Sequence, residues 1–159
     1  MKNMTRFRKG FSLIEMMIIM ALIGILSVSI GWQITRQLSR ARDSERKDDL
    51  ARIKLAFEDY YNDHGFYPPD GSLSVCENPD VNPLELWLPV IPCDPITHDP
   101  YLYEPDSATG GYRVYAALEN SLDKSVSDLG CDDPAVGCNV SGSPEYNYGV
   151  AVGVPVRMP

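Results

Sequence analysis

A long apolar stretch near the N-terminus limits the possible folds of this chain more than any other feature. From Phe11 to Trp32 there are 22 residues with one charged side chain, Glu15. As a helix this stretch would extend roughly 33 Å, which is enough to cross the hydrocarbon core of a bilayer. A secretory signal peptide has a shorter apolar region that ends in a small-residue cleavage site, and no such site follows here. The sequence therefore predicts a transmembrane helix over residues 11–32.

The cysteines decide the expected orientation of this helix. Residues 1–10 form a basic leader with four basic side chains and no acid, but three arginines also follow the helix before Asp43. All four cysteines lie in the distal half of the chain. An even number in polar, proline- and glycine-rich sequence indicates disulfides and an oxidising compartment. We expect a single pass through the inner membrane, with the leader in the cytoplasm and the C-terminal domain outside.

The cysteines are Cys76, Cys93, Cys131 and Cys138. Neighbour pairing, Cys76 with Cys93 and Cys131 with Cys138, closes the shortest loops and is the expected one of the three possible connectivities. Free buried thiols are the alternative. None of the four has the CxxC spacing of a zinc site, so we expect no bound metal at these thiols.

Composition and motifs argue against two classes of function. The net charge is −8, and loss of residues 1–10 would leave ten basic against 22 acidic side chains, a charge of −12. Binding to a phosphate backbone depends on clustered lysine and arginine, so nucleic acid is not expected as the main partner. The two histidines, His64 and His98, have no nucleophile motif beside them, and no phosphate-binding loop or HExxH occurs. We expect no enzymatic activity and no cofactor.

The single carboxylate in the apolar stretch needs compensation. An acid near the middle of a membrane helix costs about 2.5 to 3.5 kcal/mol, and one nearer the end costs less. Cleavage of the Gly10–Phe11 bond would create a positive α-amine at the start of the helix. Glu15 lies about one turn away from it, and could equally meet the amine of a neighbouring chain. The alternative is a glutamate that reaches the lipid headgroups without a partner.

The residues around this bond, Lys9-Gly10-Phe11-Ser12-Leu13-Ile14-Glu15, resemble the processing site of type IV pilins and the related type II secretion pseudopilins. The resemblance includes the short basic leader and the apolar helix that follows. It implies that a prepilin peptidase cuts after Gly10 and methylates the amine of Phe11. It also implies that Glu15 pairs with the amine of an adjacent subunit while the chain self-assembles into a helical filament on a pilus or secretion assembly platform.

The helix is expected to continue without a break through residues 33–62. Residues 40–49 are charged all round, which favours a solvated connector or a face with salt bridges between subunits. Beyond them an apolar stripe recurs at helical spacing and predicts packing against a sheet. Its members are Leu50, Ile53, Ala56, Phe57, Tyr60 and Tyr61. His64-Gly65 is a plausible stop, because glycine readily adopts the left-handed conformation at a helix end.

Residues 63–159 are expected to form a globular head with a small antiparallel sheet and disulfide-pinned loops, which makes the fold α+β. Three strands are predicted, near 100–105, at 111–118 and within 145–156, the first two as a hairpin. A short helix is expected in NPLELWLP, with Asn82 as N-cap. Residues 119–143 are expected to form a long surface loop.

The segments NDHGFYPP, DPYLYEP and GGYRVYAAL are similar to the helix exit and first hairpin of pseudopilins, including the major pseudopilin of type II secretion. Because major pseudopilins can hold calcium after this hairpin, the resemblance also offers Asp123, Ser125 and Asp128 as oxygen ligands, and calcium binding by loop 119–133 stays open. We interpret the chain as a type IV pilus-like filament subunit. The alternatives are a major pseudopilin and, in another class, a signal-anchored extracytoplasmic binding module.

Overall fold

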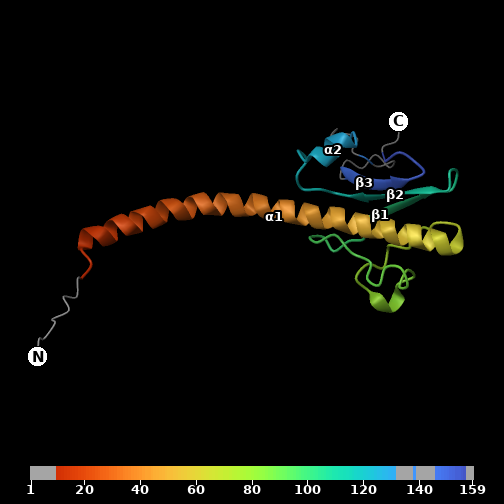
Figure 1. The fold of residues 1–159 in the computed structure, drawn as a ribbon, viewed down its shortest axis with the longest axis horizontal. Coiled ribbons are helices and arrows are strands. Elements are labelled where there is room, and N and C mark those ends of the chain that lie inside the picture. The colour runs from red at the N-terminus through yellow and green to blue at the C-terminus, as the bar shows by residue number, and fades with distance from the viewer. Residues whose placement is uncertain (1–9, 132–137, 139–145, 157–159) are drawn as a thin grey trace, which may run out of the picture. The chain divides into compact units, whose positions relative to one another are not determined.

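The computed structural model describes residues 10–131, 138 and 146–156, apart from the side chains of residues 28–36. The chain divides into two compact units, Met1–Leu38 and Ser39–Pro159, and each is described by itself. The elements in chain order are α1 (Leu13–His64), η1 (Pro79–Val81), β1 (Leu102–Asp106), β2 (Gly111–Ala116), α2 (Lys124–Asp128) and β3 (Tyr148–Val152) (Figure 1).

The first unit consists of the beginning of α1. The helix starts at Leu13, where the carbonyl oxygen of Ser12 accepts a hydrogen bond of 3.2 Å from the amide of Met16. The apolar side chains that follow are exposed. Among the residues whose side chains are described, no helix contains an apolar run of the length and hydropathy that a membrane crossing needs. The end of the predicted membrane segment falls within residues 28–36, whose side chains lie outside the described part.

In the second unit the apolar stripe of α1 packs against the sheet, as predicted. Leu50, Ile53 and Phe57 are completely buried. The ring of Phe57 meets the rings of Tyr103 and Tyr112 edge to face, at centroid distances of 5.0 and 5.1 Å. Each such apolar side chain contributes about 1.5–3 kcal/mol when it is fully removed from water. This stripe therefore holds the helix on the sheet.

The sheet has three antiparallel strands in the order β1-β2-β3. The central strand β2 is buried along its whole length. A tight turn joins it to β1, in which Gly110 has a φ of 71° and its amide donates to the carbonyl of Asp106. At Gly111 a β-carbon would overlap the carbonyl oxygen of Val152 in β3, so glycine is required for the close approach of the two strands. All three predicted strands are confirmed.

The helix ends at the predicted position. Gly65 has a φ of 79°, and its amide donates a hydrogen bond of 2.7 Å to the carbonyl of Tyr61. This is the left-handed end that glycine adopts without steric cost. The single helix Leu13–His64 agrees with the predicted span of about Phe11 to Asn62 to within two residues at either end.

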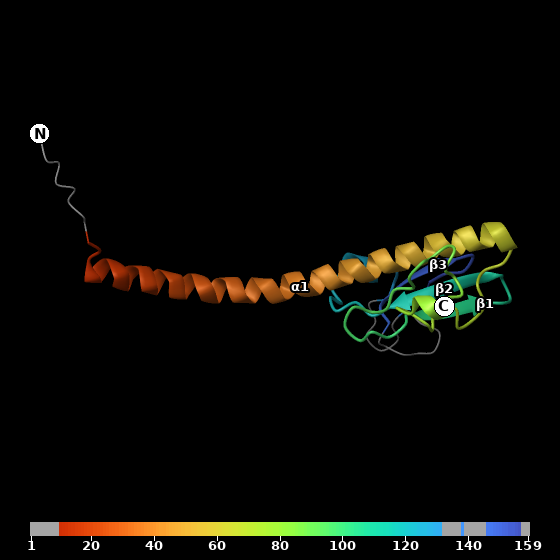
Figure 2. The ribbon, with the colours of Figure 1, turned by 90° about the horizontal axis from the view of Figure 1, so that it is seen from below.

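The segment between α1 and β1 and the sheet are separated by α1 in the view of Figure 1, but both lie on the same side of α1 in Figure 2. Leu73, Leu84, Leu88 and Ile91 from this segment are buried in the same core as the helix stripe. The helix expected in NPLELWLP is wrong. Asn82 accepts a hydrogen bond from the amide of Leu84 and donates one of 2.6 Å to the carbonyl of Leu88, and so closes a turn there. The only helical piece in the described part of this segment is η1.

The expectation of a long surface loop over residues 119–143 is wrong where its described part forms the helix α2, although the disulfide Cys131–Cys138 expected there is present. Asp123 caps helix α2 by accepting a hydrogen bond from the amide of Ser125. Val126 of α2 is buried in a second, smaller core beside the disulfide Cys131–Cys138. Burial of this valine gives the short helix a tertiary support that local sequence does not reveal. Residues 132–137 and 139–143 lie outside the described part.

The buried tyrosines differ in how their hydroxyl groups are satisfied. Tyr103 donates a hydrogen bond of 2.6 Å to the carbonyl of Pro68. The hydroxyl of Tyr112 is buried and has no hydrogen-bond partner among the described residues. A buried polar group without a partner costs about 1–3 kcal/mol, whereas a satisfied hydrogen bond contributes about 1 kcal/mol.

We therefore expect Tyr112→Phe to leave the stability of the full chain unchanged or to raise it by about 1 kcal/mol, and Tyr103→Phe to lower it by about 1 kcal/mol. Urea unfolding of both variants, followed by tyrosine and tryptophan fluorescence, measures the difference. A larger loss in Tyr112→Phe than in Tyr103→Phe would show that the hydroxyl of Tyr112 does have a partner.

Candidate functional site

The predicted cleavage site lies immediately before α1. Gly10 and Phe11 are exposed and precede the first helical residue. A β-carbon at Gly10 would meet no described atom within 4 Å, so the backbone around the Gly10–Phe11 bond is open. A peptidase needs its substrate in an accessible, non-helical form, and this junction has that form.

Glu15 lies in the first turn of α1 and is exposed. The N-terminal turn of a helix carries unpaired amide groups and a partial positive charge, which favour a carboxylate there. Among the described residues Glu15 has no ion-pair partner. The carboxylate is therefore available to a cation that a second chain brings.

A second polar site lies in the head. Asp43, Arg46 and Asp49 are at most 7 % exposed, and they continue the apolar stripe of α1 at the same helical spacing. This corrects the expectation that residues 40–49 are solvated or pair only between subunits. The charges can be buried because Asp94, Tyr101 and the connection after β2 lie against this part of the helix and supply hydrogen-bond and ion-pair partners.

Arg46 is the centre of this polar cluster. Its guanidinium forms two hydrogen bonds with the carboxylate of Asp94, at 2.7 and 3.1 Å. It also donates to Asp43 at 2.9 Å and to Glu119 at 3.1 Å. Although burial disfavours the charged form, the hydrogen bonds to the carboxylates raise the pKa of Arg46 above its ordinary value. Paired hydrogen bonds between arginine and a carboxylate are strong and fix the geometry of both groups.

Asp43 attaches the connection between β2 and α2 to the helix. One carboxylate oxygen accepts from the amide of Glu119 at 2.8 Å, and the other accepts from the amide of Asn120 at 2.9 Å. Arg42 forms a bidentate ion pair with the carboxylate of Glu119 on the solvent side of the cluster, with both contacts at 2.6 Å. The hydrogen bond from Arg42 lowers the pKa of Glu119, so this carboxylate stays charged. The connection is held at its backbone and not only by side-chain contacts.

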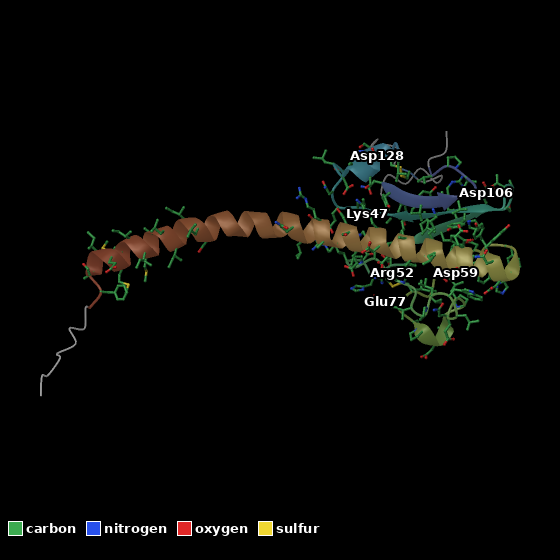
Figure 3. All side chains as sticks on the ribbon, in the orientation of Figure 1. Lys47, Arg52, Asp59, Glu77, Asp106 and Asp128 are labelled. Carbon is green, nitrogen blue, oxygen red and sulfur yellow. A yellow bond between two sulfur atoms is a disulfide. The ribbon has the colours of Figure 1, made fainter. Side chains whose placement is uncertain are left out.

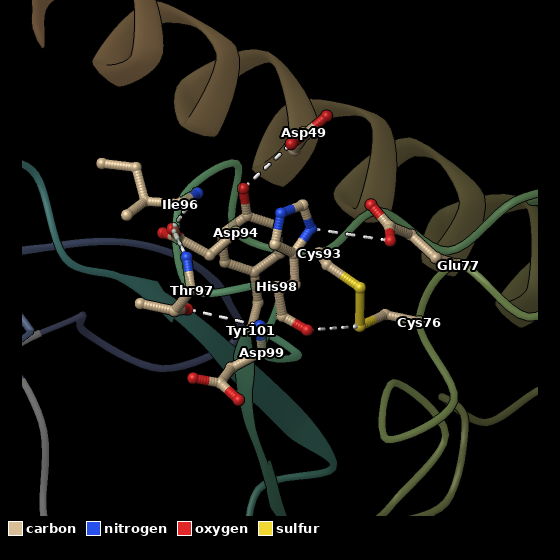
Figure 4. The surroundings of a disulfide bond; sticks show 10 residues. All are labelled: Asp49, Cys76, Glu77, Cys93, Asp94, Ile96, Thr97, His98, Asp99 and Tyr101. Carbon is tan, nitrogen blue, oxygen red and sulfur yellow. Dashed lines mark hydrogen bonds and ion pairs between the residues drawn. A yellow bond between two sulfur atoms is a disulfide. The ribbon is translucent and has the colours of Figure 1, made fainter.

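The disulfide Cys76–Cys93 brings Asp94 into this cluster (Figure 4). Asp94 follows Cys93 directly, and the two half-cystine Cα atoms are 5.3 Å apart. Besides Arg46, Asp94 accepts from the amides of Ile96 and Thr97 and so closes the turn that leads to β1. Burial raises the pKa of Asp94, but the hydrogen bond from Arg46 outweighs this and lowers it overall. The second disulfide, Cys131–Cys138, gives the neighbour pairing that the sequence analysis favoured.

The oxygen groups considered for calcium are already engaged. Lys47 forms an ion pair of 2.8 Å with Asp123 and a hydrogen bond of 3.0 Å with the hydroxyl of Ser125. Asp128 pairs with Lys124 at 2.7 Å. In the view of Figure 3 Lys47 and Asp128 are labelled above α1 and Glu77 below it. Within the described residues, no group of three or more His, Cys, Asp or Glu side chains is placed to hold a metal. An ammonium group thus supplies the positive charge beside Asp123.

This arrangement predicts how stability depends on pH. The hydrogen bond from Lys47, with that from the amide of Ser125, lowers the pKa of Asp123 to about 2. A carboxylate whose pKa is lower in the folded state stabilises the fold above its unfolded pKa, and this contribution is lost as the pH falls from about 4 to 2. Asp123→Asn keeps a good helix cap and removes only the charge.

We expect Asp123→Asn to lower the melting temperature at pH 7 by a few degrees, equivalent to about 1 kcal/mol, and the difference from the wild type to shrink between about pH 4 and pH 2. Thermal unfolding followed by circular dichroism measures it. Asp59→Asn is the matched control, because Asp59 is exposed and has no ion-pair partner in the described structure. A difference that stays constant down to pH 2 would contradict the prediction.

The two histidines have structural contacts. His64 stacks on Tyr60 at a centroid distance of 4.1 Å and meets Trp87 edge to face. His98 lies 3.7 Å from the carboxylate of Glu77 at an exposed position.

The sequence analysis missed the polar cluster around Arg46. A signal was present, because Asp43 and Arg46 precede Leu50, Ile53 and Phe57 at intervals of three or four residues and so belong to the same helix face. A charged residue that continues an apolar stripe indicates a buried ion pair when partners exist elsewhere. Those partners, Asp94 and Glu119, are 48 and 73 residues away, and the sequence does not identify them.

Comparison with known proteins supports the N-terminal site. Residues 5–31 match the family described as the prokaryotic N-terminal methylation motif. Over 70% of its length the chain is 28% identical to the type II secretion system core protein G of Pseudomonas aeruginosa, of which it covers 83%. It is 26% identical to the protein of the same name in Escherichia coli, over 69% of this chain and 81% of that protein. It is 36% identical to the type IV major pilin protein PilE of Neisseria gonorrhoeae over 43% of this chain and 41% of that protein. No solved structure matches the chain significantly.

The fold is of the α+β class and is built around one N-terminal helix. An exposed junction precedes this helix, and its second half packs on a three-stranded antiparallel sheet in the head. The matched methylation motif covers the junction and the start of this helix. The motif and these relatives support the type IV pilin and type II secretion pseudopilin family for this chain.

Proposed function

We propose that this chain is the structural subunit of a type IV pilus-like filament. It inserts as a single-pass precursor into the inner membrane, with the head outside. A prepilin peptidase cuts after Gly10 and methylates the amine of Phe11. The mature chain then self-assembles into a helical filament on a pilus or secretion assembly platform, with its apolar helix inside and its head on the surface.

One observation carries the proposal: an exposed carboxylate, without a described ion-pair partner, stands one turn behind an open Gly-Phe junction on an otherwise apolar helix. Cleavage would place a cation on Phe11, and Glu15 of an adjacent subunit can neutralise it. The exposed apolar side chains of the helix lose contact with lipid or water when copies pack together. Both effects favour assembly, and the role is structural rather than catalytic.

A specific observation favours the pseudopilin as a second candidate. The match to protein G extends over most of both chains and includes the head, whereas the match to the pilin covers less than half of either. A fibre subunit and a secretion pseudopilin share the helix and the processing site, so the difference between them lies in the head. Both candidates are compatible with the relatives.

Mass spectrometry of the N-terminus, on protein purified from its native membrane, tests the proposal. We expect a mature chain that begins at methylated Phe11. An intact leader on protein that has reached its final location would contradict the proposal and would point to the signal-anchored binding module instead.

A further inference from the structure

Four aromatic rings form a cluster at the C-terminal end of α1. Tyr60 and His64, in the last turns of the helix, stack at a centroid distance of 4.1 Å with 14° between their planes. Trp87 meets both rings edge to face, at 4.7 and 5.1 Å. Phe66 meets them in the same way at 6.0 and 5.8 Å. Trp87 comes from the segment between α1 and β1, so this aromatic cluster joins two parts of the head.

The aromatic cluster is open to solvent. Phe66 is 56 % exposed and His64 is exposed as well. Leu86, which precedes Trp87 in the chain, is 85 % exposed. Adjacent aromatic side chains at a surface are typical of the hot spots of protein interfaces, in which tryptophan and tyrosine are enriched. Rings that already hold one another in place lose little conformational entropy on binding. The cluster therefore has the composition of a docking site.

A carboxylate stands beside these rings. Oδ2 of Asp63 accepts a hydrogen bond of 2.8 Å from the indole Nε1 of Trp87, which fixes the carboxylate next to the cluster. Among the described residues, no lysine, arginine or histidine forms an ion pair with Asp63. A cation placed here would be attracted both by the negative charge and by the faces of the aromatic rings.

The charge of the surrounding chain also favours a cation. Between Lys54 and Arg113 the sequence contains acidic side chains throughout and no lysine or arginine. The exposed acids of this stretch are Asp59, Asp63, Asp70, Glu77, Asp80, Glu85 and Asp99. Every residue of the aromatic cluster belongs to the same stretch. An anionic ligand would therefore be repelled, and a neutral one would gain nothing from this charge.

We propose that the aromatic cluster and Asp63 form a docking site for an arginine-bearing segment of another protein. This inference goes beyond the proposed function and depends neither on cleavage nor on assembly. Charge complementarity identifies the occupant. A guanidinium is planar and weakly hydrated, so it stacks on an aromatic face while its N–H groups donate to a carboxylate. The ammonium of lysine does not stack and is more strongly hydrated.

Tryptophan fluorescence of the full chain in detergent tests the site. Trp32→Phe leaves Trp87 as the only tryptophan, and the probe is a short synthetic peptide that alternates arginine and leucine. We expect a saturable change in the emission of Trp87. The peptide with lysine in place of arginine is expected to bind at least about threefold more weakly. No response to the arginine peptide, or equal affinity for the two peptides, would overturn the proposal.

Two aspartates of α1 separate the site from general acidity. Asp63→Asn keeps the side-chain shape and an acceptor for Trp87, and it is expected to weaken binding of the arginine peptide about fivefold. Asp48→Asn removes the same charge from an exposed position roughly four turns earlier, so it should leave the affinity unchanged. If both variants bind equally weakly, net charge alone attracts the peptide and the site does not exist.

The ring of Phe66 has its own pair of variants. Phe66→Tyr keeps an aromatic face and is expected to bind the arginine peptide like the wild type. Phe66→Leu keeps an apolar side chain without a ring and is expected to bind about threefold more weakly, with an unchanged melting temperature. Equal affinities of these two variants would remove the aromatic cluster from the site.

Other occupants would give different results. If a second copy covers the cluster, the emission of Trp87 changes with protein concentration in the absence of peptide. If a carbohydrate does, the emission responds to cellotetraose and not to the arginine peptide. Either result contradicts the proposal. Precursor and mature chain are expected to bind the peptide equally, so a chain that is cleaved and assembles but binds no peptide refutes only the docking site, whereas a chain that binds the peptide but is never cleaved refutes only the proposed function.

Discussion

Glu15→Gln is expected to abolish filament formation while cleavage after Gly10 continues. Glutamine has nearly the same shape as glutamate and carries no charge, so the apolar helix and the processing site are preserved. In a packed bundle the amine of Phe11 would then be buried without a counter-charge. Removal of one partner of a buried ion pair costs about 3–5 kcal/mol, which corresponds to a loss of at least about 100-fold in each subunit contact.

The measurement is the amount of sheared or secreted filament per cell, with the mature and precursor forms separated by mass. Glu45→Gln is the matched control, because Glu45 is an exposed glutamate of the same helix outside the apolar segment, and it should leave the yield unchanged. Wild-type amounts of filament from Glu15→Gln cells would refute the ion-pair explanation of assembly.

Arg46→Met is expected to destabilise the head by about 3–5 kcal/mol. Methionine fills much of the arginine volume but leaves the buried carboxylate of Asp43 and the partly buried carboxylate of Asp94 without the cation that compensates them. The connection after β2 and the turn after Cys93 both lose their attachment to α1. Denaturant unfolding of the full chain in detergent measures the loss.

Two further variants separate this effect from a general loss of charge. Arg52→Met removes an exposed arginine with no ion-pair partner in the described structure and should change stability by less than about 0.5 kcal/mol. Adding Asp94→Asn to Arg46→Met should recover part of the loss, because it removes a charge that has become unpaired. If the double variant is as unstable as the sum of the two single variants, Arg46 and Asp94 act independently.

Much of the fold was predictable from local patterns. The strands β2 and β3 are rich in tyrosine and valine, and β1, which contributes Tyr103, is joined to β2 by a turn rich in glycine. The helix end at Gly65 required only the conformational freedom of glycine. The errors arose where one side-chain hydrogen bond or a tertiary contact decides the local structure. Asn82 closes a turn with Leu88 in place of a helix, and Val126 orders α2 by entering a core that local sequence does not define.

The candidate site divides in the same way. The processing junction, the apolar helix and Glu15 are consecutive in the chain, so spacing, charge and hydropathy were sufficient to recognise them. The cluster around Arg46 joins residues that are 48 to 77 positions apart, and its ion pairs exist only once helix, disulfide loop and sheet connection have come together. Local chemistry along a helix can be read from one segment, but the burial and pairing of a charge depend on which distant groups the fold brings within about 3 Å of it.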